Sequence, residues 1–134
     1  MSTAENKEFI RQLFTEMSNG NVNAYLESLA ENGRFTIIGT TKYSGTFQGK
    51  QEFIDRVLAP LGAQLDGKLT LTIDNLLAEG EYVVMQSRGQ SKTKAGKTYN
   101  NTYCHVFRLG GGKVQELVEY LDPAVITAAF GDRT

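Results

Sequence analysis

Two spacings of hydrophobic residues divide the chain. Up to about residue 60, apolar residues recur every three or four positions, which is the spacing of one face of an α-helix. This pattern predicts a helix that Ser2 or Thr3 caps and that ends at residues 19–20. It also predicts a short helix around residues 25–29 and a third over residues 50–58, closed by a proline and a glycine.

From about Lys68 onward the spacing changes to two, which is typical of β-strands. The predicted strands cover residues 68–74, 81–90, 98–109 and 113–121, after two short extended segments at 35–38 and 43–47, and a small helix over 123–130 closes the chain. Glycine-containing turns at 79–80, 95–96 and 110–112 join the four main strands, and such short connections make neighbours antiparallel. Helices followed by a sheet predict an α+β domain with the helices on one face, and the length suits a single domain over residues 1–134.

Composition and charge narrow the possible partners. The net charge is −1 and no strong basic patch is visible, so we expect no nucleic acid partner. No apolar run approaches the roughly 18 residues that span a bilayer, so no membrane association is expected. Cys104 is the single cysteine, which leaves no intramolecular disulfide, and the polar N-terminus lacks the apolar stretch of a signal peptide. We therefore expect a cytoplasmic protein.

The turns also predict which residues of neighbouring strands face each other. Two-residue turns at 79–80 and 95–96 and a three-residue turn at 110–112 would align Leu71, Arg88, Tyr103 and Glu119 across four strands. The same face would carry Gln86 opposite His105, His105 opposite Leu117, and Asn101 opposite Leu121. Polar groups framed by aliphatic residues on neighbouring strands predict a ligand pocket.

The reverse face of the predicted sheet is not plainly polar. It would carry Val83, Met85, Val106, Val118 and Tyr120. An antiparallel sheet with one face in water shows a cleaner alternation of polar and apolar residues. We therefore predict that a second copy of the chain covers part of this face and forms a homodimer.

Several motifs resemble a known family. The helical first half and the strands, with the segments Tyr99-Asn100-Asn101-Thr102-Tyr103, Phe107-Arg108, Gly112-Lys113-Val114 and Glu119-Tyr120-Leu121-Asp122, are similar to the SnoaL-like branch of the nuclear transport factor 2-like superfamily. The resemblance covers nearly the whole chain and implies a cone: a curved antiparallel sheet with about three N-terminal helices on its concave face. The superfamily includes ketosteroid isomerase, polyketide cyclases and limonene epoxide hydrolase, so the resemblance implies a pocket for a small metabolite without naming the reaction.

The catalytic residues of these relatives do not carry over intact. By the resemblance, the general-base aspartate of ketosteroid isomerase falls at Ile37, and its oxyanion-stabilising tyrosine falls at Leu13 or Phe14. The Asp-Arg-Asp set of the epoxide hydrolase becomes Arg88, Gln86 and Glu119, and its water-holding positions become Phe35 and Ile37. Neither established mechanism is therefore expected.

Four residues remain as candidates for chemistry, each with a structural alternative. Glu119 would act as a general acid or base, or would pair with Arg88 or Tyr103 and hold the sheet in register. Arg88 would bind a ligand carboxylate or enolate, or would only neutralise Glu119. Tyr103 would donate a hydrogen bond to a ligand carbonyl, or fill space. His105, the only histidine, would take part in proton transfer, or be a buried histidine bonded to Gln86.

The sequence thus predicts an isomerase, cyclase or hydrolase that acts without a cofactor, with Glu119 as acid or base. The alternative is a binding module or dimeric scaffold that holds a metabolite in the same pocket. The residues expected to contact the ligand are Gln86, Asn101, Leu71, Ile37, Leu117 and Leu121. No metal site is expected, because Cys104 and His105 are neighbours on one strand and point to opposite faces.

Overall fold

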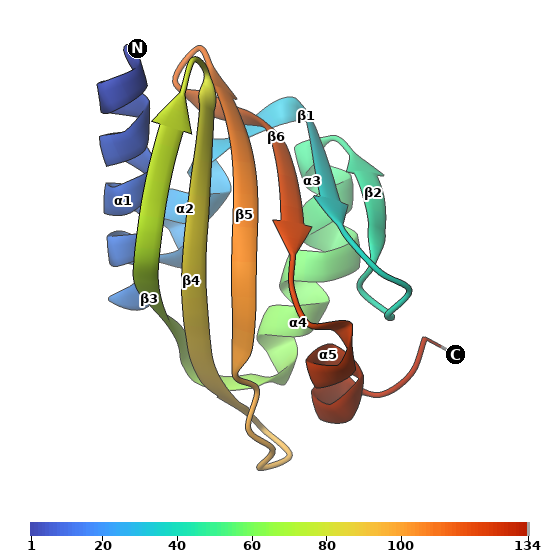
Figure 1. Ribbon diagram of the computed structural model, residues 1–134. Coiled ribbons are helices and arrows are strands. Elements are labelled where there is room, and N and C mark those ends of the chain that lie inside the picture. The colour runs from blue at the N-terminus through green and yellow to red at the C-terminus, as the bar shows by residue number, and fades with distance from the viewer. Residues whose placement is uncertain (134) are drawn as a thin grey trace.

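The computed structural model describes residues 1–133 and contains a curved sheet of six strands (Figure 1). The strands are β1 (Leu29–Ile37), β2 (Gly45–Gln48), β3 (Leu65–Glu79), β4 (Tyr82–Thr93), β5 (Asn101–Gly110) and β6 (Lys113–Tyr120), in the spatial order β2-β1-β6-β5-β4-β3. The helices are α1 (Thr3–Ser18), α2 (Val22–Ser28), α3 (Lys50–Phe53), the π-helical turn η1 (Ile54–Leu58), α4 (Ala59–Gln64) and α5 (Pro123–Phe130). The predicted α+β class is confirmed.

The predicted four-stranded meander is present as β3 to β6, with antiparallel pairing throughout. The sheet as a whole is mixed, however, because β1 pairs in parallel with β6. The prediction of a purely antiparallel sheet is therefore wrong. Hairpin turns predict only the pairing of strands that follow each other, whereas β1 and β6 are far apart in the sequence.

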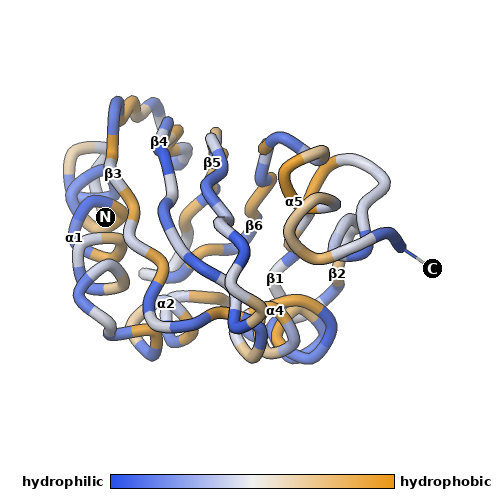
Figure 2. Tube along the Cα trace, turned by 90° about the horizontal axis from the view of Figure 1, so that it is seen from below, coloured by the Kyte–Doolittle hydropathy of each residue, from blue (hydrophilic) through white to orange (hydrophobic). Residues whose placement is uncertain are grey.

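Helices α1, α2 and α4 lie along one side of the arc that the sheet forms (Figure 2). Ser2 caps α1 through a capping box with Glu5, in which each side chain bonds the backbone N–H of the other residue. The third predicted helix is longer than expected, because helical structure continues past residue 58 to Gln64. Pro60 does not end it: the π-helical turn η1 comes directly before Pro60, with the Ala59 N–H bonded to the carbonyl of Ile54, and such a turn accommodates a residue that lacks an N–H. None of the helices within residues 1–133 has the length and apolar character needed to cross a membrane.

The turn between β4 and β5 holds three residues, where the sequence predicted two. The Thr93 N–H donates to the carbonyl of Lys97 at 2.8 Å, and the Gly96 N–H donates to the carbonyl of Thr93 at 2.9 Å. Gly96 has a φ of +86°, the left-handed conformation that completes a three-residue hairpin loop. The longer turn moves the register between β4 and β5 by one residue.

The turn between β5 and β6 is shorter than predicted. Gly110 pairs with Lys113, which leaves Gly111 and Gly112, with φ of +59° and +74°, as a two-residue turn. A bulge follows, and together the two changes move the register by two residues from the prediction. A shift of two keeps every side chain on its predicted face.

Candidate functional site

A cavity of about 250 Å³ lies between the inner face of the sheet and the helices. Its walls are mostly aliphatic and aromatic, and include the predicted contact residues Ile37 and Leu71. The polar side chains in its lining are Tyr25, Lys68, Tyr99, Tyr103, His105 and Glu119. An apolar cavity with a few polar groups has the character of a small-molecule site.

His105 and Glu119 form the centre of the site. They are direct neighbours on β5 and β6, where His105 had been predicted to face Leu117. The His105 Nε2 atom lies 2.9 Å from Glu119 Oε1, and the side chains are 6% and 16% exposed. Both residues line the cavity, so a hydrogen-bonded carboxyl group meets any ligand that enters it.

Aromatic rings fix the imidazole of His105 on three sides. Phe107 stacks on it with ring centres 5.6 Å apart and planes 9° apart, Tyr103 lies at 5.3 Å, and Phe14 of α1 lies at 5.7 Å. Phe107 and Tyr103 flank His105 on β5 because side chains two residues apart share a face of a strand. The sequence therefore places a rigid hydrogen-bonding group beside the carboxyl group of Glu119.

The hydrogen bonds of His105 indicate its tautomer. Its Nδ1 atom is buried and has no partner among residues 1–133, while Nε2 contacts Glu119. If the proton is on Nε2, it forms the hydrogen bond to the carboxylate, and the buried Nδ1 carries only an unused lone pair. If the proton were on Nδ1, it would be a buried donor without an acceptor, which is rarer in proteins than a buried acceptor without a donor. His105 therefore donates its Nε2 proton to Glu119.

Three buried tyrosines line the cavity together with Glu119 and remain protonated. Burial raises the pKa of Tyr25, and the charge of Glu119 raises it further. Burial is also the largest cause of the raised pKa of Tyr99 and of the strongly raised pKa of Tyr103, to which Glu119 adds in both cases. These phenols are therefore hydrogen-bond donors and do not act as bases at neutral pH.

Tyr99 was not among the candidates from the sequence, yet it joins the site. Its hydroxyl oxygen accepts hydrogen bonds from Tyr103 at 3.1 Å and from Asn101 Nδ2 at 3.4 Å. These two bonds occupy its lone pairs, and its own proton has no acceptor among the described residues. The alternation along the strand predicted over residues 98–109 contained the signal, since Tyr99 stands two and four residues before Asn101 and Tyr103.

The predicted placement of Arg88 and Gln86 in the pocket is wrong. The one-residue shift puts Arg88 opposite Thr102 and Gln86 opposite Cys104, so both side chains are on the outer face and exposed. The Arg88 guanidinium donates to Asp74 at 2.7–3.1 Å, and these bonds hold the pKa of Asp74 below its usual value. Arg88 therefore neither neutralises Glu119 nor reaches a ligand in the cavity.

Three further predicted contact residues lie outside the cavity wall. Asn101 is buried, and its amide group pairs with the backbone of Asp122 at 3.0 Å and 3.2 Å, which fixes the start of α5. Leu117 is buried in the core opposite Phe107, and Leu121 lines a separate depression. Ile37 and Leu71 are the predicted contact residues that the cavity retains.

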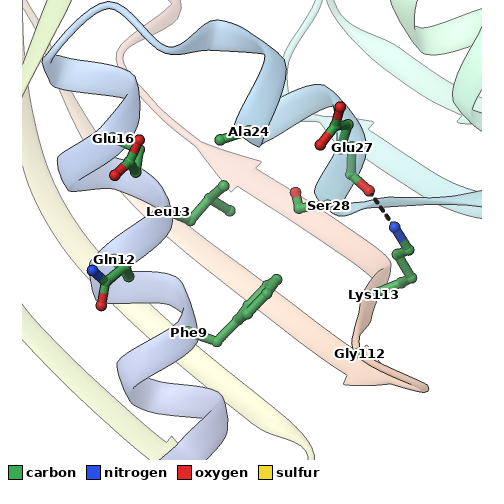
Figure 3. Close-up of a pocket in the computed structure, with 9 residues that line it drawn as sticks. All are labelled: Phe9, Gln12, Leu13, Glu16, Ala24, Glu27, Ser28, Gly112 and Lys113. Carbon is green, nitrogen blue, oxygen red and sulfur yellow. Dashed lines mark hydrogen bonds between the residues drawn. The ribbon is translucent and has the colours of Figure 1, made fainter.

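Another depression, of about 320 Å³, lies between α1, α2 and the turn before β6 (Figure 3). Several of its polar groups already bond within the chain. Lys113 Nζ donates to the carbonyl of Glu27 near the end of α2 at 2.6 Å, and Glu16 accepts from Asn21 at 2.9 Å. Phe9 forms part of its apolar wall. With these partners in place, this depression offers a ligand fewer free polar groups than the cavity beside Glu119 does.

Metal-binding chemistry has no evident support within residues 1–133. No group of three histidine, cysteine, aspartate or glutamate side chains in this part of the chain lies close enough to hold a metal ion. His105 is buried on the inner face, and Cys104, on the outer face, pairs across the sheet with Gln86 and Tyr120.

Comparisons with known proteins agree with this architecture. Residues 10–117 match the SnoaL-like domain. Uncharacterized proteins of Mycobacterium tuberculosis and Mycobacterium bovis are 26% identical over 121 residues, which cover 87% of this chain and 89% of theirs.

Three solved structures share the fold. An NTF2-like protein of unknown function from Burkholderia pseudomallei has a TM-score of 0.80 at 20% identity, covering 96% of this chain and 98% of that one. TerC, co-crystallized with polyporic acid, has a TM-score of 0.76 at 18% identity, with coverages of 92% and 96%. An LEH-like epoxide hydrolase from Mycobacterium tuberculosis has a TM-score of 0.74 at 13% identity, with coverages of 95% and 90%. At these identities the similarity concerns the fold alone.

Proposed function

Because the chain belongs to the SnoaL-like domain family, we propose that it is a small-molecule enzyme of the isomerase, cyclase or hydrolase type that uses no cofactor. The observation that carries the proposal is the carboxyl group of Glu119 in the cavity wall. Its Oε1 is fixed by His105, while its Oε2 has no hydrogen-bond partner among residues 1–133. Glu119 is the acid or base, and His105 positions it.

A carboxylate with one oxygen held by His105 and the other free can move a proton between carbon atoms of a ligand. Oε2 of Glu119 takes a proton from a carbon atom beside a ligand carbonyl, and the electron pair of that C–H bond moves to the carbonyl oxygen. The Glu119 carboxylic acid then returns the proton to another carbon of the conjugated enolate, which gives an isomer. Alternatively, the carbon nucleophile attacks a second carbonyl and closes a ring, and the Glu119 carboxylic acid gives its proton to the alkoxide that this attack forms. Throughout, the Nε2–H of His105 holds Oε1 and keeps the reacting oxygen in place.

The phenols provide the complementary donor. The unpaired hydroxyl proton of Tyr99 is available to a ligand oxygen that becomes negative during proton removal. Tyr103 and Asn101 donate to the oxygen of Tyr99 and thereby orient that proton. Tyr103, predicted from the sequence as a direct donor to the ligand, acts in this proposal through Tyr99.

The experiment that tests this function is proton exchange in D₂O, followed by NMR, on a set of small carbonyl compounds with one or two rings. We expect the wild-type protein to exchange protons next to the carbonyl of at least one compound faster than buffer does. A Leu61→Trp variant, which fills the cavity from its wall, provides the control and should not accelerate exchange. Equal rates with both proteins would contradict the removal of a proton from carbon by Glu119, on which the isomerase and cyclase forms of the proposal depend.

The alternative is a binding module that holds a metabolite in the same cavity. It is favoured by the apolar residues Ile37, Leu13 and Phe14, which stand where the resemblance places the catalytic groups of ketosteroid isomerase. A compound that raises the melting temperature of the wild type but not of Leu61→Trp, without any exchange or turnover, would establish this alternative.

We also propose that the outer face of the sheet forms a homodimer. Val84, Val106 and Val118 are aligned across β4, β5 and β6, while Val83 and Met85, predicted to lie there, are buried inside. Around this row lie exposed apolar side chains and charges of both signs: Leu77, Tyr82, Tyr120, Arg88, Asp74, Arg108 and Glu116. Arg88 pairs with Asp74 and Arg108 with Glu116 within the chain, so a second copy turned about a two-fold axis could cover the valine row without burying an unpaired charge.

A lysine at the centre of this face should separate the dimer. We expect the wild type to sediment as a dimer and Val106→Lys as a monomer with an unchanged far-UV circular dichroism spectrum, because burying an unpaired charge is costly. Val22→Lys, at a 51% exposed position of α2, is the matched control and should remain dimeric. A monomeric wild type would contradict the proposal.

A further inference from the structure

Lys68 lies in the cavity wall at an irregular part of β3. The pairing with β4 shifts between Asp66 and Thr70, and Gly67 adopts a φ of +84° within this stretch. Lys68 and Leu69 both line the cavity, although successive residues of a regular strand face opposite sides. Such irregularities redirect side chains, and they are common beside functional sites.

The ammonium group of Lys68 is unneutralised. It forms no ion pair or hydrogen bond with any residue in the described part of the chain, and Lys68 is the one lysine or arginine among the residues that line the cavity. The other side chain of the lining with a formal charge at neutral pH is Glu119, which bonds to His105. The rest of the lining is largely apolar, and includes Leu69 and Leu71.

We propose that Lys68 binds the anionic group of an organic acid whose apolar body occupies the cavity. The substrate is then an amphipathic monoanion, with the acid group at Lys68 and the reacting carbonyl group toward Glu119. The volume of about 250 Å³ lies below the usual range for drug-sized ligands, so one or two rings fit. The orientation of the substrate, with its carbonyl group toward Glu119, rests on the proposed role of Glu119. The binding of the anionic group by Lys68 does not rest on that role.

A matched pair of probes tests this inference: 2-naphthoate, an anion, and 2-naphthamide, its neutral counterpart of similar size and shape. Isothermal titration calorimetry should show that the wild type prefers the anion, and that Lys68→Gln weakens its binding roughly two- to fivefold, as expected for a charge-assisted contact of an exposed side chain. The affinity for the amide should remain the same. Added salt should weaken binding of naphthoate alone, because it screens the charge of Lys68.

Two further variants separate this contact from a general effect of charge. Lys68→Arg should keep the preference for the anion, and Lys92→Gln, which removes a charge on β4 outside the cavity, should behave as the wild type. Equal losses for both probes in Lys68→Gln, no loss for naphthoate, or no binding of either probe to the wild type would overturn the inference. A Glu119→Gln variant could keep both the preference for the anion and the full turnover of the wild type. That result would refute the proposed catalytic role of Glu119 but not the binding of the anion by Lys68.

Discussion

Replacing Glu119 by glutamine is expected to lower turnover by about 10²- to 10⁴-fold, the usual contribution of a positioned general acid or base. Glutamine has nearly the same shape, and its carbonyl oxygen still accepts the hydrogen bond from His105 Nε2 that now holds Glu119 Oε1 at 2.9 Å. It cannot accept a proton from carbon. Binding of a ligand, measured by calorimetry, should therefore remain within about threefold of the wild type.

Two other variants sharpen this prediction. Glu119→Asp keeps the carboxyl group but withdraws it from His105 and from the ligand, so turnover should fall less than in Glu119→Gln. Arg88→Gln is the control, because the side chain of Arg88 is 54% exposed and bonds to Asp74 on the outer face. It should leave turnover unchanged. Full turnover in Glu119→Gln would refute the role of Glu119 as acid or base. If Arg88→Gln lowered turnover as much as Glu119→Gln does, the placement of the active site in the inner cavity would be wrong.

The sequence predicts the main elements because each has a long, regular pattern. Apolar residues recur every three or four positions in α1 and every second position in β4 to β6, because each of these elements buries one face. The parallel pairing of β1 with β6 has no comparable local signal, since it depends on how a distant segment returns to the sheet. The same is true of the extension of the third helix beyond Pro60.

The site shows how one residue in a turn decides which groups meet. Between β5 and β6 the shorter turn and the bulge each shift the register by one residue, which gives a total shift of two. Because an even shift keeps each side chain on its face, Tyr103, His105 and Glu119 stay on one face as predicted. Between β4 and β5 a single extra residue in the turn sends Arg88 and Gln86 outward. Turn length depends on a local balance of backbone hydrogen bonds that the glycine pattern alone does not specify.

The core beneath the site should be the most sensitive region for stability. Phe107 is 0% exposed and packs against Phe14 at 5.7 Å and His105 at 5.6 Å. Phe107→Ala leaves a cavity at this point and should lower the free energy of unfolding by about 3–5 kcal/mol, measured by urea denaturation. That is a large part of the roughly 5–15 kcal/mol typical of a domain. Phe107→Leu, which keeps more of the volume, should lose less and stay folded.

An exposed aromatic residue provides the comparison for this effect. Tyr82, 47% exposed on neighbouring β4 in the single chain, should lose less than about 1 kcal/mol on replacement by alanine in the monomeric Val106→Lys background, because little of its surface is removed from water there. Because Phe107 stacks on the imidazole that holds Glu119, Phe107→Leu should also reduce turnover while the protein remains folded. A loss for Phe107→Ala no larger than that for Tyr82→Ala would show that the imidazole is not held by packing, and the rigid support on which the acid–base role of Glu119 depends would be absent.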